Sequence, residues 1–174
     1  MDKRELAETL QALDQRLTSP CDLLLVGGAA MILHFGAGRA TRDVDAILLR
    51  GDLAQLRQAI VAVGRERKLP EDWLNDAVKG FADILPSDFD RRLVPLELPL
   101  ERLRLYAPGL PDQVAMKIVA LREQDLEDLE LLLPELSEAD REVVIAIMNH
   151  VATFRLDWAQ KMRYFLLEQG WPIP

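Results

Sequence analysis

Two short apolar runs near the start of the chain constrain the fold most. Residues 22–26 read Asp-Leu-Leu-Leu-Val and stop at Gly27-Gly28, and residues 43–49 read Asp-Val-Asp-Ala-Ile-Leu-Leu. Runs of this length, apolar and bounded by glycine or loop residues, are typical of buried strands. The apolar segment 29–35 between them is compatible with a helix and is followed by more glycines. We therefore expect a strand, a short helix and a second strand in one core.

Helical spacing dominates on both sides of this unit. Leucines between residues 6 and 17 recur at intervals of three or four, which predicts an amphipathic helix with one buried stripe. Residues 52–67 have a similar stripe, and Asp52 is a good N-cap for a helix that starts there. We also expect a helix over residues 71–79, after a proline.

The stretch before residue 107 contains two further candidate strands. Residues 93–98 and 102–106 have the composition of strands, and the second alternates Leu with Arg. Pro95 and Pro99 assign the first of them to the edge of a sheet, because proline cannot donate a hydrogen bond to a neighbouring strand.

From Pro111 onward the pattern is helical to the end of the chain. We therefore expect an α+β fold, in which a small mixed sheet flanked by helices carries a helical C-terminal extension. The α/β core and its N-terminal helix are assigned to residues 1–108, and the helical region, packed on that core, to residues 109–174. The predicted C-terminal helices are 112–123, 125–133, 137–149 and 153–168.

Composition and charge exclude several classes of protein. The 174 residues are 49% hydrophobic and carry a net charge of −8. Such a chain can bury a core but is poorly suited to nonspecific nucleic-acid binding, which depends on Lys and Arg. Cys21 is the single cysteine, so no internal disulfide can form and a structural zinc site is disfavoured. The charged N-terminus does not resemble a secretion signal, and no apolar stretch approaches the roughly 20 residues that span a bilayer. We expect a cytoplasmic protein that does not enter the membrane.

Two aspartates at the second strand are the strongest candidates for metal ligands. If the chain is extended from Arg39 to Asp45, alternate side chains share a face, and these are Arg39, Thr41, Asp43 and Asp45. Carboxylates at positions i and i+2 have α-carbons about 6.5–7 Å apart, so their oxygens can converge on a hard cation. Mg²⁺, or Mn²⁺, suits such a pair, because one or two carboxylates and substrate phosphate oxygens typically hold it.

Gly27-Gly28 supplies a candidate phosphate cradle. Glycine lets the backbone approach a polyphosphate closely, and a helix that begins near Ala29 presents free N–H groups to an anion. Taken singly, a Gly-Gly pair is usually a turn, and an Asp-x-Asp pair is common. The ordered set of strand, Gly-Gly, short helix, Arg-x-Thr-x-Asp-x-Asp and strand is far more specific. A phosphate cradle beside a metal pair is what phosphoryl or nucleotidyl transfer requires.

The motifs resemble those of the DNA polymerase β-like nucleotidyltransferase superfamily. The matching residues are 25–30, Leu-Val-Gly-Gly-Ala-Ala, and 39–45, Arg-Ala-Thr-Arg-Asp-Val-Asp. Within the superfamily, the chain is most similar to small bacterial proteins related to AbiEii-type abortive-infection toxins. Those proteins carry a downstream helix with Lys, Ala and an acidic ending, which residues 116–129 match as Met-Lys-Ile-Val-Ala-Leu-Arg-Glu-Gln-Asp-Leu-Glu-Asp-Leu. The resemblance covers residues 22–133. It implies a minimal nucleotidyltransferase domain that uses Mg²⁺ and a nucleoside triphosphate such as ATP.

Lys117 lies in the otherwise apolar segment 114–121. Its ammonium group must reach solvent, pair, or face a polar cleft, because an unpaired buried charge is costly. Snorkelling to solvent and contact with the triphosphate or the aspartates are both open. Asp125 is eight residues further on, about 12 Å along a continuous helix, so we do not expect Lys117 and Asp125 to pair. Asp125 either caps a new helix or contributes to the nucleotide site.

A third carboxylate is the least certain part of the predicted site. Many members of the superfamily use one on a later strand to complete the metal site and to act as general base for the acceptor hydroxyl. Glu97 is the best-placed candidate, and a surface position is its competing interpretation. Trp73 belongs to a Trp-Leu-Asn pattern that recurs in similar proteins, and core packing or a place beside the cleft would explain it. Weaker candidates for the third acid are Asp83, Asp88 and Asp90.

Two functions follow from these residues. The first is an enzyme that moves a nucleotide monophosphate from a nucleoside triphosphate to an unknown protein or RNA acceptor, in a toxin–antitoxin or phage-defence system. The second is a catalytically degenerate binding module, an antitoxin or the partner of a neighbouring gene's product. The acidic segment 125–142 suits the second function, because an acidic surface shields a basic partner. In the enzyme, Asp43, Asp45 and Glu97 are catalytic, and the nucleotide-binding residues are Gly27, Gly28, Arg39, Thr41, Lys117 and Asp125.

Overall fold

The computed structural model describes residues 1–75 and 83–173, which fall into two compact units. The first unit is Met1–Lys79 with Leu93–Pro108, and the second is Gly80–Arg92 with Gly109–Pro174. The segment that ends at Arg92 groups with the C-terminal helices, whereas the sequence assigned it to the α/β core. Within the second unit, the Arg92 guanidinium donates to both carboxylate oxygens of the buried Asp112, at 2.8 and 2.9 Å.

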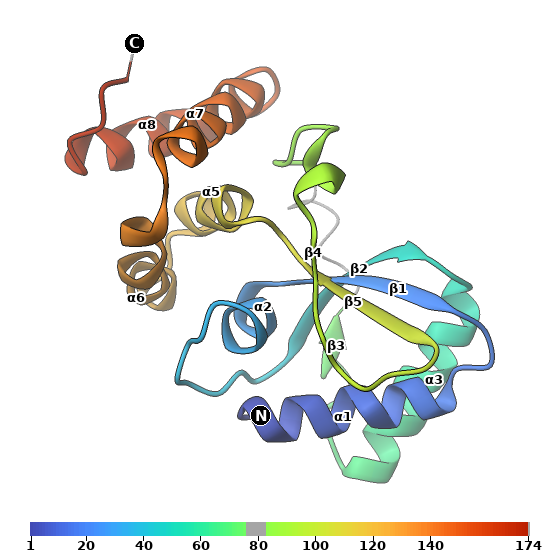
Figure 1. Ribbon diagram of the computed structural model, residues 1–174. Helices are drawn as coiled ribbons and strands as arrows, with labels where there is room; N and C mark the ends of the chain where they lie inside the picture. The colour runs from blue at the N-terminus through green and yellow to red at the C-terminus, as the bar shows by residue number, and fades with distance from the viewer. Residues whose placement is uncertain (76–82, 174) are drawn as a thin grey trace. The chain divides into compact units, whose positions relative to one another are not determined.

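The first unit is built on a mixed sheet, so the α+β class is confirmed (Figure 1). The described strands lie in the order β3-β2-β1-β5-β4. The pair β1–β2 is antiparallel and β1–β5 is parallel, while β2–β3 is parallel and β4–β5 antiparallel. The strand with two prolines nearby, β4, lies at the sheet edge as predicted. The bounds are Cys21–Val26 for β1, Val44–Arg50 for β2, Leu74–Asn75 for β3, Val94–Pro95 for β4 and Leu103–Ala107 for β5.

Alternation along the strands divides this sheet into two faces. One face packs against helices α1 (Lys3–Arg16) and α3 (Leu53–Arg67), which contact one another. This face presents alternate residues of β1, β2 and β5 to the core. Side chains point to opposite faces at successive positions, so Asp45, next to the core residue Val44, lies on the other face. The core residues from these strands are Cys21, Leu23, Leu25, Val44, Ala46, Leu103 and Leu105.

The helix predicted over residues 71–79 is wrong where the structure describes it. Leu74–Asn75 is a strand instead, and residues 76–79 lie outside the described part of the chain. The backbone N–H of Val44 donates to the Trp73 carbonyl at 2.7 Å, which fixes this strand against β2. The Trp73 ring is fully buried, and its indole N–H donates to the Ile60 carbonyl at 3.0 Å. Core packing is therefore the correct interpretation of Trp73.

The second unit is helical, as predicted from residue 109 onward. Helix α5 contacts helices α6, α7 and α8. Ser137 and Asp140 form a capping box at the start of α7. The Lys161 ammonium group of α8 donates to the Val119 carbonyl at 2.8 Å, near the end of α5. No helix in the described part of the chain is both long and apolar enough to cross a membrane. The bounds are Leu110–Ala120 for α5, Glu123–Leu132 for α6, Glu138–Ala152 for α7 and Leu156–Glu168 for α8.

Candidate functional site

The turn between β1 and helix α2 (Gly27–Leu33) lies against Asp45. Val26 at the end of β1 pairs with Asp45 of β2, so the carboxylate lies beside the residue that follows Val26. That residue is Gly27, whose φ of +59° suits glycine. A Cβ at Gly27 would lie 3.1 Å from the Asp45 carboxylate oxygen Oδ2. Sheet register thus places a partly exposed carboxylate directly against a glycine turn.

Gly28 is enclosed by the loop that precedes β2. A Cβ at this position would lie 2.7 Å from the Thr41 hydroxyl oxygen and 3.4 Å from Nη1 of Arg39. The Thr41 side chain is buried, and its hydroxyl donates to the Asp43 carbonyl at 2.9 Å. The structure therefore brings Gly27, Gly28, Arg39, Thr41 and Asp45 together, with Asp43 held next to them by Thr41.

The predicted extended chain from Arg39 to Asp45 is wrong, although it named the residues that meet. The backbone bends at Arg39, Arg42 and Asp43, and β2 begins only at Val44. The Thr41 N–H donates to the Met1 carbonyl at 2.8 Å, so this loop pairs with the N-terminal residue and not with the sheet. The loop has to return the chain from α2 to the sheet, which a straight strand cannot do.

The donor chemistry of Asp43 and Asp45 fits a hard divalent cation. Both side chains are partly exposed, and carboxylate oxygens are ligands that Mg²⁺ prefers. Within residues 1–75 and 83–173, no group of three His, Cys, Asp or Glu side chains is placed to hold a metal ion. Two carboxylates with open positions for phosphate oxygens still suit Mg²⁺, which rarely has an all-protein cage.

Glu97 lies at the opposite end of the sheet from Asp45. The Leu96 N–H donates to the Leu105 carbonyl at 2.9 Å, which continues the β4–β5 register and places Glu97 beside Arg104. Arg104 pairs with Asp22, at the other end of β1 from Val26. Four residues of strand span about 13 Å, and Glu97 is exposed. The structure does not bring this residue to the aspartates.

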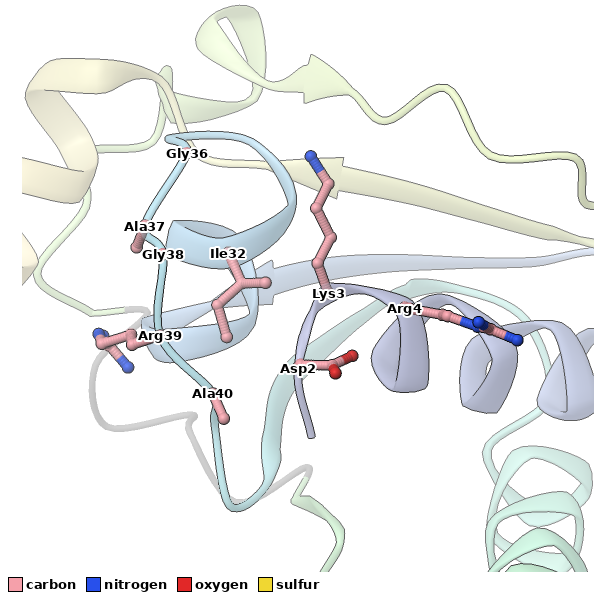
Figure 2. A pocket seen from close by; sticks show the side chains of 9 residues that line it. All are labelled: Asp2, Lys3, Arg4, Ile32, Gly36, Ala37, Gly38, Arg39 and Ala40. Atoms are coloured by element: carbon pink, nitrogen blue, oxygen red, sulfur yellow. The ribbon is translucent and has the colours of Figure 1, made fainter.

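A cavity of about 510 Å³ is lined by the loop that carries Arg39 and by the start of α1. Figure 2 shows Ile32 projecting into it from α2, with Lys3 extended along the side formed by the start of α1. The Arg39 side chain points away from Asp2 and Lys3 in this view, and its Nη1 lies near Gly28 instead. Arg39 therefore lines the cavity and also reaches the glycine turn.

Lys117 and Asp125 form an ion pair in the second unit, which contradicts the sequence prediction. The Lys117 ammonium nitrogen lies 2.7 Å from Oδ1 of Asp125 and 2.6 Å from Oδ2 of Asp128, and all three side chains are buried. The 12 Å separation assumed one continuous helix. Instead α5 stops at Ala120, and Leu121 adopts a left-handed conformation at φ 46°. The chain turns there, and α6 brings both aspartates back to the lysine.

Asp125 also caps α6, and a cap of a new helix was one of the two roles predicted for this residue. Its carboxylate accepts from the backbone N–H and the Nε of Arg122, both at 3.0 Å. Snorkelling of Lys117 to solvent is wrong, because the side chain is only 5% exposed. A signal for the cap was the sequence Arg122-Glu123-Gln124-Asp125, which has an acid at the N3 position of a new helix.

Acid should weaken the second unit through Asp125. Burial raises the pKa of this carboxyl group, but hydrogen bonds from Lys117 and Arg122 outweigh burial, and the net pKa is lowered. A group whose pKa is lower in the folded state stabilises the fold above its unfolded pKa, about 3.9 for Asp, and loses that contribution as pH falls through the folded pKa. We expect the free energy of unfolding to decline below about pH 5.

Urea unfolding of the wild type and of Asp125→Asn between pH 3 and 6 tests this expected decline. An equally steep decline in both proteins would contradict it.

Gly28→Ala should disturb the cradle. The new Cβ would lie 2.7 Å from the Thr41 hydroxyl, so Thr41 must move and lose its bond to Asp43. Overpacking costs about 1–3 kcal/mol, against about 0.5–1 kcal/mol gained from helix propensity. We expect a net loss of about 1 kcal/mol in unfolding free energy and a weaker rise in melting temperature with nucleoside triphosphate and Mg²⁺.

Gly38→Ala is the control, because nothing lies within 4 Å of its Cβ position. Equal behaviour of the two variants would contradict the cradle geometry.

Comparison with known proteins identifies a family for this chain. Searches of curated proteins and of solved structures give no significant match. A family model described as a nucleotidyltransferase of unknown function (DUF6036) matches residues 4–171. The match covers both units and includes the glycine turn, both aspartates and the Lys117 ion pair. The chain therefore belongs to this nucleotidyltransferase family.

Proposed function

We propose that this protein transfers a nucleotide monophosphate from a nucleoside triphosphate to a hydroxyl group of a protein or RNA acceptor. One observation carries the proposal. Asp45, Thr41 and Arg39 converge on the Gly27-Gly28 turn, in a chain of a nucleotidyltransferase family. A carboxylate and a guanidinium at a glycine turn provide what a triphosphate and its cation need.

In this proposal, the glycine turn and the cationic side chain contact the phosphates, and the carboxylates bind the cation. The Gly27-Gly28 backbone would approach the β- and γ-phosphates, and Arg39 would neutralise their negative charge. Asp43 and Asp45 would hold Mg²⁺ or Mn²⁺, which supplies charge neutralisation to the triphosphate when bound. Thr41 holds the loop, since its hydroxyl bonds to the Asp43 carbonyl. In the reaction, the acceptor hydroxyl releases its proton to solvent, and a bond forms between its oxygen and the α-phosphorus. The bond from that phosphorus to the β-phosphate oxygen breaks, and pyrophosphate leaves.

The Lys117 ion pair has a structural role in this proposal. Both aspartates lie within 2.7 Å of the lysine nitrogen, so its charge is already compensated. The pair joins α5 to α6 across the turn at Leu121. A role in a toxin–antitoxin or phage-defence system rests on the resemblance to AbiEii-type proteins. Identifying the protein or RNA that accepts the nucleotide tests this role.

Label transfer is the direct test. The protein is incubated with each of the four α-labelled nucleoside triphosphates, Mg²⁺ and a bacterial extract, beside Asp43→Asn/Asp45→Asn. Label that appears on protein or RNA with the wild type and disappears with the double variant supports the enzyme. Nuclease or protease treatment then identifies the acceptor. If no triphosphate transfers label and none raises the melting temperature with Mg²⁺, the proposal fails.

A binding module is the second candidate function. The observation in its favour is that no third carboxylate joins Asp43 and Asp45 within the described residues. A protein of this kind would bind nucleoside triphosphate and Mg²⁺ without transferring the nucleotide. A rise in melting temperature that Asp43→Asn/Asp45→Asn removes, with no label transfer by the wild type, would favour the module over the enzyme.

A further inference from the structure

Strand β3 places Asn75 beside Asp45. The two strands are parallel, with Val44 opposite Leu74 and Asp45 opposite Asn75. Neighbouring strands lie about 4.8 Å apart, and Figure 1 shows β3 along the outer edge of β2. Both residues are close to the ends of their strands, where the loop with Asp43 joins β2.

The same register decides which way Asn75 points. Val44 and Leu74 are both buried in the core that α1 and α3 cover. Successive side chains alternate between faces, so Asp45 and Asn75 both project from the opposite face. Asn75 is partly exposed there. Its side chain therefore shares the face and the sheet position of the proposed metal ligand.

The chemistry of an asparagine at this position points to an oxygen ligand. Asparagine is depleted in strands, and this one lies beside Asp45, on the face opposite to Val44 and Leu74. A side-chain amide oxygen is a hard donor, of the kind that coordinates divalent cations of this class. The best sequence candidate for a third ligand, Glu97, lies at the far end of the sheet, and no third acidic, His or Cys side chain of the described residues completes the pair.

We infer that Asn75 is a third protein ligand of the cation, through its side-chain oxygen, beside Asp43 and Asp45. This inference rests on the proposed function, because it needs the cation that those aspartates would hold. In this inference, the neutral amide of Asn75 takes the place of the third carboxylate that the sequence led us to expect. A site with two charges and one amide would bind the free cation more weakly than three carboxylates would.

Titration with Mn²⁺ alone, followed by electron paramagnetic resonance of the free ion, tests the inference without any turnover. Asn75→Ala removes the oxygen and should raise the Kd for Mn²⁺ by about tenfold, the lower end for loss of a group that supports a metal site. Asn75→Asp keeps an oxygen and adds a negative charge, so it should bind Mn²⁺ at least as tightly as the wild type. Asn149→Ala, at an exposed position of α7, is the matched control and should leave the Kd unchanged.

Each other outcome has a defined meaning. An unchanged Kd in Asn75→Ala overturns the inference. Binding by Asn75→Asp as weak as by Asn75→Ala also overturns it, because the amide N–H and not the oxygen would then matter. If the wild type does not bind Mn²⁺, or if Asp45→Asn binds it equally well, the metal site of the proposed function itself fails. Melting temperatures without Mn²⁺ show whether each variant is folded.

Discussion

Asp45→Asn should lower the rate of nucleotidyl transfer by about 10³-fold or more, equivalent to about 4 kcal/mol of lost transition-state stabilisation. The substitution removes the charge at the carboxylate that lies nearest to the glycine turn, 3.1 Å from a Cβ at Gly27. An amide of the same shape keeps the packing, so the melting temperature without nucleotide should change by no more than a few degrees. The measurement is label transfer under single-turnover conditions, with the triphosphate that the screen identifies.

The control for Asp45→Asn is Glu130→Gln, which makes the same chemical change at an exposed position of α6. It should retain wild-type activity and stability. Full activity of Asp45→Asn would show that the reaction occurs elsewhere, and loss of activity together with a large fall in melting temperature would show that Asp45 acts through the fold.

Lys117→Met should destabilise the protein by about 3–5 kcal/mol, the usual cost of removing one partner of a buried ion pair. Asp125 and Asp128 are each 1% exposed, so the variant leaves two neighbouring buried carboxylates without their lysine. Urea unfolding at pH 7 measures the loss. If Lys117→Met does not fold, Lys117→Arg keeps the charge and should be destabilised less.

Lys3→Met is the matched control, because Lys3 is exposed at the start of α1. Its free energy of unfolding should stay within about 0.5 kcal/mol of the wild type. If Lys117→Met keeps its stability but loses the melting-temperature rise with nucleoside triphosphate, the lysine contacts the nucleotide and the structural role is wrong.

Local patterns in the sequence were enough for most of the secondary structure. Leu6, Leu10 and Leu13 predicted α1, and all three are fully buried. Asp52 was a sufficient signal for α3, where its carboxylate accepts from the N–H groups of Ala54 and Gln55. Helix periodicity and N-caps depend on residues a few positions apart, so they can be read without knowing the fold.

The break between α5 and α6 was predicted, but its position was wrong: the predicted helix runs to residue 123, whereas α5 ends at Ala120. The left-handed residue is Leu121, although this conformation costs a side chain such as leucine about 1–2 kcal/mol. Two contacts stabilise the left-handed turn. One is distant in sequence, and the other crosses the turn. Lys161 donates to carbonyls at the end of α5, and the Lys117 pair holds α6 in place. The predicted separation of Lys117 and Asp125 was wrong because it was measured along one continuous helix, whereas the turn at Leu121 brings the two side chains together.

For the candidate site, the sequence by itself determined which residues gather at the glycine turn. Gly27, Gly28, Arg39, Thr41 and Asp45 were identified from their order and spacing, and the structure places them together. Their chemistry and their closeness along the chain made this possible, even though the assumed strand geometry between Arg39 and Asp43 was wrong.

Only the tertiary structure decided what stands next to those residues. Strand register placed Glu97 at the far end of the sheet and Asn75 beside Asp45. Register depends on pairing between segments that are far apart in sequence, and a shift of one residue would turn every side chain to the other face. Residue types and local spacing contain no information about that pairing, so the residues at the glycine turn could be predicted from the sequence, and the position of Asn75 beside Asp45 could not.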